Sequence, residues 1–129
     1  SARASGMNYL LVMLGGAIGS VARFGIGKLT LGWFGPNYPW GTLTVNLVGG
    51  LLMGLLVGVL ARVSASDQWR VFAAIGVLGG FTTFSSFALD TVNMIERGDL
   101  AAALGYILLS VAGAVLGVFA GIALVRALA

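Results

Sequence analysis

Cysteine and histidine are absent from this 129-residue chain, and their absence excludes several classes of function. A chain without cysteine forms no disulfide and has no thiol nucleophile, and a chain without histidine lacks the usual ligands of zinc and haem. Charge is also scarce, since charged residues make up 9% of the sequence, against about 25% in soluble domains. The carboxylates are Asp67, Asp90, Glu96 and Asp99.

Hydrophobic residues are abundant instead, at 59% of the chain. About 20 apolar residues cross a bilayer as a helix, and four such runs cover residues 8–31, 41–61, 68–96 and 100–126. The pattern predicts an all-α membrane protein with four transmembrane helices per chain, forming one domain over residues 7–129. Residues 1–6 lack the apolar run of a signal peptide and are interpreted as a tag remnant or a disordered start outside the fold.

The basic residues are scattered and give a net charge of +3. They form no patch, which argues against a nucleic-acid partner. An even number of spans places both termini on one side, and the basic residues of the two sides nearly balance: Arg62, Arg70 and Arg126 lie with the termini, and Lys28, Arg97 and Arg23 lie opposite. Such a weak positive-inside bias permits insertion in both orientations, and therefore an antiparallel homodimer. The alternative is one fixed orientation that these charges do not reveal.

Glycine occurs 21 times, and many glycines recur at every fourth position. Small residues at this spacing lie on one helix face and let helices approach closely in lipid. The stripes are Gly15, Gly19, Arg23 and Gly27; Asn46, Gly50, Gly54 and Gly58; and Gly113, Gly117 and Gly121. They predict a tight multi-helix assembly in which any pathway lies between chains. The loop of residues 32–41, GWFGPNYPWG, carries four aromatic residues that suit contact with membrane lipid at the interface.

Two stripes contain a polar residue. Arg23 either anchors its span at the interface, clamps loop carbonyls, or attracts anions to a vestibule. Asn46 either joins helices through a hydrogen bond worth about 0.6 kcal/mol or presents two uncharged N–H donors to an ion. In the last span the hydroxyls of Tyr106 and Ser110 lie one turn apart. A row of neutral donors suits a passing anion, which must bind well enough to enter and weakly enough to leave.

The third span is longer than a bilayer requires and contains the stretch GVLGGFTTFSSFALD at residues 76–90. Adjacent glycines and hydroxyls weaken a helix, so we expect the third helix to be broken at mid-membrane. Carbonyls freed by a break can hold a cation, and freed N–H groups favour an anion. The alternative is a glycine kink whose carbonyls are met by the hydroxyls of Thr82, Thr83, Ser85 and Ser86.

Three phenylalanines, Phe81, Phe84 and Phe87, follow in the same stretch. Such a stripe usually packs in a core or against lipid. An aromatic ring also has a positive edge, so rings turned edge-on can assist an anion in a dry passage.

These residues resemble the Fluc family of small bacterial fluoride channels. The resemblance runs from Met7 onward and rests on GGAIGSVARF, TLTVNLVGGLLMG and GVLGGFTTFSSF in the first three spans. It implies an antiparallel homodimer of the plasma membrane with two narrow pores. These pores would pass fluoride passively, reject chloride and lower cytoplasmic fluoride.

The resemblance also implies roles for individual residues. A structural sodium ion at the dimer centre would be held by the main-chain carbonyls of Gly79 and Thr82 from both chains. The residues placed along the pore are Asn46, Phe84, Phe87, Ser110 and Tyr106, with Thr83 and Ser85 as neighbours and Arg23 near the entrance.

Other classes of protein fit the sequence less well. A small multidrug-type proton-coupled exporter shares the four-helix plan, but such exporters use a carboxylate in the first span, and residues 7–31 contain none. A membrane enzyme needs an acid, base or nucleophile deep in the bundle, and Asp90 is expected to cap a helix at the interface. A scaffold of packed spans explains the glycines but leaves Asn46 and Ser110 without a purpose.

Overall fold

The computed structural model describes residues 2–128, and these residues are helical apart from short connections. The elements in chain order are α1 (Ala2–Phe34), α2 (Trp40–Leu60), α3 (Asp67–Arg70), η1 (Val71–Leu78), α4 (Gly79–Phe81), α5 (Phe84–Glu96) and α6 (Leu100–Leu128). Four helical segments are long and apolar enough to cross a membrane: α1, α2, the run Asp67–Glu96, and α6. The predicted all-α fold with four spans is therefore confirmed.

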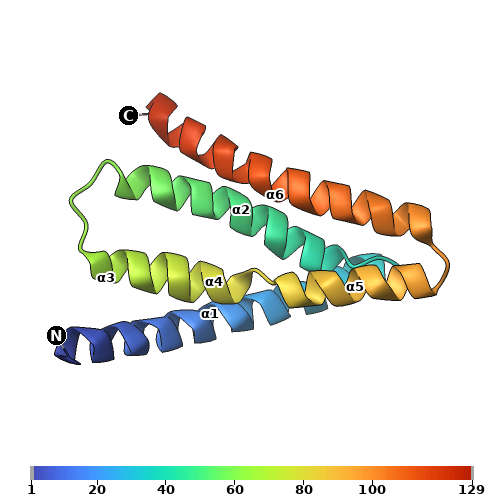
Figure 1. The fold of residues 1–129 in the computed structure, drawn as a ribbon, viewed down its shortest axis with the longest axis horizontal. Helices are drawn as coiled ribbons and strands as arrows, with labels where there is room; N and C mark the ends of the chain where they lie inside the picture. Colours follow the sequence, from blue (N-terminus) through green and yellow to red (C-terminus); the bar gives the residue numbers. More distant parts are fainter. Residues whose placement is uncertain (1, 129) are drawn as a thin grey trace.

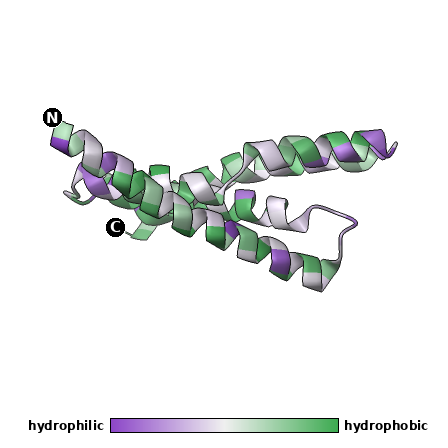
Figure 2. Cartoon of the chain, turned by 90° about the horizontal axis from the view of Figure 1, so that it is seen from below, coloured by the Kyte–Doolittle hydropathy of each residue, from purple (hydrophilic) through white to green (hydrophobic). Residues whose placement is uncertain are grey.

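The four spans lie side by side and alternate in direction, so both ends of the chain lie at the same end of the bundle (Figure 1). The α2 helix packs along α6, while α1 packs along η1 and α4. Hydrophobic colour covers much of the helices in the view of Figure 2, with hydrophilic colour near the ends and at a few places between them, and many large apolar side chains are exposed. A bundle that is apolar outside as well as inside suits lipid as its solvent.

Two features differ from the sequence-based expectation. The disordered start expected for residues 1–6 is not seen over residues 2–6, which are exposed but continue α1 toward the N-terminus; Ser1 lies outside the described residues. The first half of the third span is also not a regular α-helix, because Val71–Leu78 form a π-helix. There a backbone N–H bonds to the carbonyl five residues earlier, as Gly79 N–H does to Ala74. Such wider turns are frequent at functional sites.

The glycine stripes make close helix contacts, as their spacing predicts. A methyl group on Gly19 of α1 would collide with the main-chain oxygen of Val77 in η1. A methyl group on Gly54 of α2 would likewise collide with the main-chain oxygen of Val118 in α6. Because these contacts involve backbone, no side-chain rotation relieves them. The stripes therefore set the distance between the helices that carry the candidate site.

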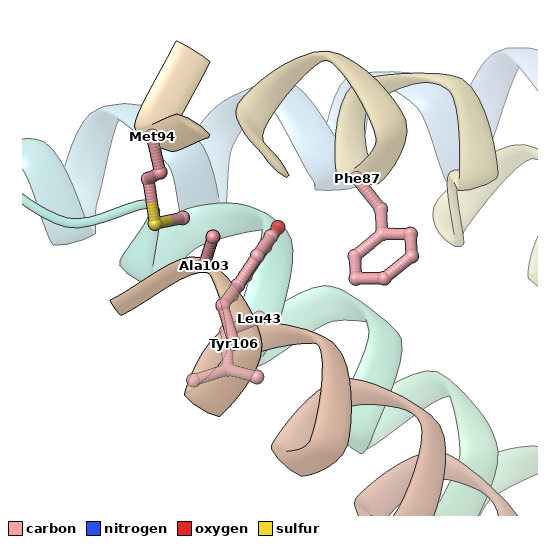
Figure 3. Packing of buried hydrophobic residues seen from close by; sticks show 5 residues of the cluster. All are labelled: Leu43, Phe87, Met94, Ala103 and Tyr106. Carbon is pink, nitrogen blue, oxygen red and sulfur yellow. The ribbon is translucent and has the colours of Figure 1, made fainter. Parts of the chain in front are cut away.

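A small apolar core lies at the end of the bundle where α5 turns into α6. Its buried residues are Leu43, Phe87, Met94, Ala103 and Tyr106. Figure 3 shows the Tyr106 side chain extending from α6 toward α5. This core fixes α5 against α2 and α6, and so positions the residues that follow the helix interruption at Thr82 and Thr83.

Candidate functional site

The third span leaves helical geometry at two consecutive residues. Thr82 has φ −85° and ψ 157°, and Thr83 has φ −148° and ψ 123°, so both are extended. The hydroxyl and the N–H of Thr82 both donate to the carbonyl of Leu78, at 3.0 and 3.1 Å. One carbonyl of the preceding turn is thus satisfied twice by one residue. The remaining carbonyls of that turn need other partners.

Those remaining carbonyls are mostly without partners. The carbonyl of Gly80 accepts from Nε of Arg23 at 3.1 Å. The carbonyls of Gly79, Phe81 and Thr82 accept no hydrogen bond from another described residue. Of the hydroxyls in the TTFSS run, that of Thr82 meets the carbonyl of Leu78, and none meets the carbonyls of Gly79, Phe81 or Thr82. An unpaired carbonyl in an apolar setting is costly, so this cluster is suited to a cation.

Asn46 ties the interruption to α2. Its Nδ2 donates to the carbonyl of Thr83 at 3.0 Å, and its Oδ1 accepts from the N–H of Thr83 at 2.9 Å. This pair fulfils the joining role considered for Asn46. An amide NH₂ carries two hydrogens, so one donor of Asn46 remains for another acceptor.

The N-terminus of α5 has free donors. The hydroxyl of Thr83 accepts from the N–H of Ser86 at 3.2 Å and lies 3.4 Å from the hydroxyl of Ser85. The N–H groups of Phe84 and Ser85 bond to no other described residue. Free N–H groups and the helix dipole give this end a partial positive charge that favours an anion.

A groove of about 410 Å³ runs past this helix end. Its lining includes six residues singled out in the sequence: Asn46, Thr82, Thr83, Phe84, Phe87 and Ser110. The Ser110 side chain is buried, and its Oγ has no hydrogen-bond partner among the described residues. An unpaired buried hydroxyl is destabilising, so a ligand that accepts its hydrogen would remove that cost. Most of the remaining lining is apolar or glycine, from α2 and α6.

The aromatic residues of the site have different surroundings. Phe84 is 79% exposed, whereas Phe87 is buried, and their ring centroids are 5.6 Å apart. Phe87 in turn lies 5.2 Å from the ring of Tyr106. The buried ring of Phe87 therefore forms one edge of the groove. The ring of Phe84, which is largely exposed in the single chain, forms the other edge.

Tyr106 and Asp90 form a pair that the sequence did not predict. Tyr106 is fully buried, and its hydroxyl donates to Oδ2 of Asp90 at 3.0 Å. The carboxylate was expected to cap a helix at the interface, and it instead accepts from α6. No spacing rule connects residues on separate helices, so no sequence signal marked this contact. Tyr106 consequently does not line the groove beside Ser110.

Arg23 and Gly79 also lie outside the groove lining. Arg23 donates from its guanidinium to a main-chain carbonyl of α4, which is a helical carbonyl and not one of the loop carbonyls considered in the sequence analysis. The lining also includes Gly49 and Met53 of α2, which the sequence analysis did not assign, and Gly50, which it assigned to helix packing. Gly49 sits so close to Thr82 that an added methyl group would collide with the threonine side chain. Within residues 2–128, no group of three or more acidic side chains is arranged to hold a metal ion.

The sequence of this chain matches a known protein family and many of its members. The family model described as CrcB-like protein, Camphor Resistance (CrcB), matches residues 10–122. The chain belongs to the CrcB family. A family member from Agrobacterium fabrum, named fluoride-specific ion channel FluC, is 54% identical over 121 residues, covering 93% of this chain and 97% of the relative.

Two further relatives show the same extent of similarity. FluC 2 of Nitrobacter hamburgensis is 49% identical over 121 residues, covering 93% of this chain and 98% of the relative. FluC of Sphingopyxis alaskensis is 49% identical over 124 residues, covering 95% of this chain and 98% of the relative. Both relatives are named fluoride-specific ion channels. The matched regions include the Thr82–Thr83 interruption and the groove beside it.

Proposed function

We propose that this chain forms a fluoride-selective passive ion channel that exports fluoride and lowers its cytoplasmic concentration. The observation that carries the proposal is the groove at the start of α5, where neutral donors converge and the Ser110 hydroxyl lacks a partner. Donors without a formal charge bind an anion loosely enough for it to leave. The names of the close relatives supply the identity of the anion.

The interruption is proposed to lie at mid-membrane. Thr82 and Thr83 fall midway along the 30-residue helical run Asp67–Glu96. At about 1.5 Å per residue, this position is near the centre of a bilayer if the run crosses it. Charge stabilisation by helix ends is most valuable there, because the surrounding dielectric is low.

A second chain in antiparallel orientation is proposed to complete each pore. The groove is open along one side of the single chain, and Phe84, which lines it, is largely uncovered. A partner of the same sequence would cover this side and give two equivalent pores. The nearly equal basic charges of the two loop sets permit both orientations. A compartment-sensitive reporter fused to the C-terminus should give signal from both sides, and signal from one side alone would contradict dual insertion.

A sodium ion is proposed at the dimer centre, held by the carbonyls of Gly79 and Thr82 from both chains. The fit rests on the chemistry of these oxygens, which are unpartnered within the described chain and suit a hard cation. The bound ion would supply a positive charge beside the groove. Arg23 donates to the neighbouring carbonyl of Gly80, so this carbonyl has a partner within the chain.

The exporter alternative receives no support. The relatives bear the names of ion channels, and α1 contains no carboxylate that could carry a proton. A passive channel needs neither a proton carrier nor an energy source.

The direct experiment is ion efflux from liposomes that contain the purified protein, measured with fluoride- and chloride-selective electrodes. We expect rapid fluoride efflux and chloride efflux no faster than from protein-free liposomes. Equal efflux of both anions would refute selectivity, and no fluoride efflux would refute the function. Uptake of an organic cation driven by a pH gradient would favour the exporter.

A further inference from the structure

Another cavity has Asp90 in its lining and lies where the loop after α1 enters α2. Its volume is about 280 Å³. The polar and aromatic residues of its lining are Thr30, Tyr38, Trp40, Thr42 and Asp90. Ligand sites are usually concave, with a few polar groups on largely apolar walls and volumes of about 300–1,000 Å³. At about 280 Å³ this cavity lies just below that range, so its size suits a small ligand.

The cavity carries one negative charge. Asp90 and Tyr38 are the ionisable residues in the described lining, and burial raises the pKa of Tyr38 above its ordinary value of 10, so the phenol stays neutral. Asp90 forms no ion pair with a described residue, and among these residues its hydrogen-bond partner is the Tyr106 hydroxyl, which donates to Oδ2. Lys28 follows a lining residue, yet its Nζ lies 5.6 Å above the ring of Phe24. No described residue of this chain therefore supplies a positive charge that pairs with the Asp90 carboxylate.

The aromatic walls favour a particular kind of countercharge. The rings of Tyr38 and Trp40 lie 4.8 Å apart at 53°, and Phe34 packs 5.4 Å from Trp40. Aromatic faces attract organic cations, with tryptophan the strongest. A small metal ion instead prefers several oxygen ligands, and Asp90 is the only carboxylate in the described lining of this cavity. A carboxylate beside aromatic rings is a combination that suits an ammonium group.

We propose that this cavity binds an ammonium group, with Asp90 as its counter-ion and Tyr38 and Trp40 as its aromatic walls. The group is carried either by a small free organic cation or by the ethanolamine headgroup of a phospholipid. The loop aromatics fit a position at the membrane interface, where both sources are present. This site does not depend on fluoride passage, because it uses a different cavity.

The fluorescence of Trp40, which lines the cavity, reports on ligand binding. In the double variant Trp33→Phe/Trp69→Phe, Trp40 is the remaining tryptophan. The detergent-solubilised variant is titrated with tetramethylammonium chloride or with sodium chloride, and the emission of Trp40 is followed. We expect a saturable change with tetramethylammonium only. Adding Asp90→Asn should weaken the apparent affinity at least tenfold, while Asp99→Asn, a carboxylate removed from an exposed position, should leave it unchanged.

A second measurement guards against a folding defect of the Asp90 variant. Equilibrium dialysis with radiolabelled tetramethylammonium is repeated on Tyr38→Leu, which keeps the carboxylate and removes an aromatic wall, and a loss of several-fold in affinity is expected. Competition by phosphatidylethanolamine but not phosphatidylglycerol in nanodiscs would assign the site to a lipid headgroup; absence of competition would assign it to a free cation. Equal responses to both salts, or unchanged affinity in both Asp90→Asn and Tyr38→Leu, would overturn the proposal.

Discussion

The two sides of the Thr82–Thr83 interruption have opposite chemistry. On the α4 side, the carbonyls of Gly79, Phe81 and Thr82 have no partner among the described residues. On the α5 side, the N–H groups of Phe84 and Ser85 are free. Two extended residues thus separate a set of unpartnered carbonyls from a set of free N–H groups.

The two sides also differ in how they are held. The α4 side is fixed by backbone contact, because Gly80 lies so close to α1 that a methyl group would sit 2.7 Å from the carbonyl oxygen of Gly16. The α5 side is fixed by side chains, through Asn46 at the interruption and through Phe87 and Tyr106 in the core. We therefore expect substitutions on the α4 side to affect mainly folding, and substitutions on the α5 side to affect mainly ion passage.

The largest effect is expected for Asn46→Asp. A carboxylate cannot donate to the Thr83 carbonyl, and it places a negative charge where an anion would pass. Fluoride efflux from liposomes should fall to the level of protein-free liposomes. Asn93→Asp, an exposed position on α5, is the matched control and should retain efflux. Wild-type efflux from Asn46→Asp would remove Asn46 from the pore.

Gly19→Ala tests the packing of α1 against η1 and α4, the part of the third span before the interruption. The added methyl group meets the main-chain oxygen of Val77, and overpacking of this kind costs about 1–3 kcal/mol. The thermal unfolding midpoint in detergent should fall and less folded protein should be recovered. Gly25→Ala on the same helix has nothing within 4 Å of the new methyl and should behave as wild type. Equal midpoints for the two variants would show that α1 and η1 are not held by this contact.

Phe84→Ile should lower fluoride efflux and leave the folded protein intact. The ring is largely exposed in the single chain, so its loss removes little packing, but it removes the aromatic edge at the groove. Electrode traces and size-exclusion profiles would be compared with those of Phe119→Ile, an exposed ring on α6. If Phe84→Ile conducts like the control, the ring serves packing between chains only.

Ser110→Ala is expected to have the smallest effect on efflux, which should fall a few-fold. The thermal stability of this variant should increase. Removing a buried hydroxyl that lacks a partner relieves a cost of about 1–3 kcal/mol, so the unfolding midpoint should rise. A variant that is more stable and conducts less would separate function from fold. Lower stability would mean that the hydroxyl has a structural partner.

The sequence predicted features that depend on local pattern. The four spans follow from apolar runs, and the helix contacts of Gly19 and Gly54 follow from spacing. The glycines and hydroxyls of residues 79–86 indicated where helical geometry is weak, and the extended residues Thr82 and Thr83 lie inside that stretch.

Features that depend on contacts between distant residues were not predicted. The Tyr106–Asp90 hydrogen bond joins two helices, and nothing in either segment alone indicates it. The π-helix of Val71–Leu78 was also missed, because an apolar run has no residue pattern that distinguishes it from an α-helix. Among the alternatives for Arg23, only the packing of α1 against α4 selects the carbonyl of Gly80 as partner.

The most direct test of the central claim uses the absence of native cysteine. A single Ser110→Cys variant is treated with methyl methanethiosulfonate, which adds a small methylthio group, and complete modification is verified by mass spectrometry. Leu108→Cys on the exposed face of α6 is the control. If fluoride passes along the groove, modification at position 110 should stop fluoride efflux and modification at position 108 should not. Unchanged efflux after complete modification at position 110 would contradict the account.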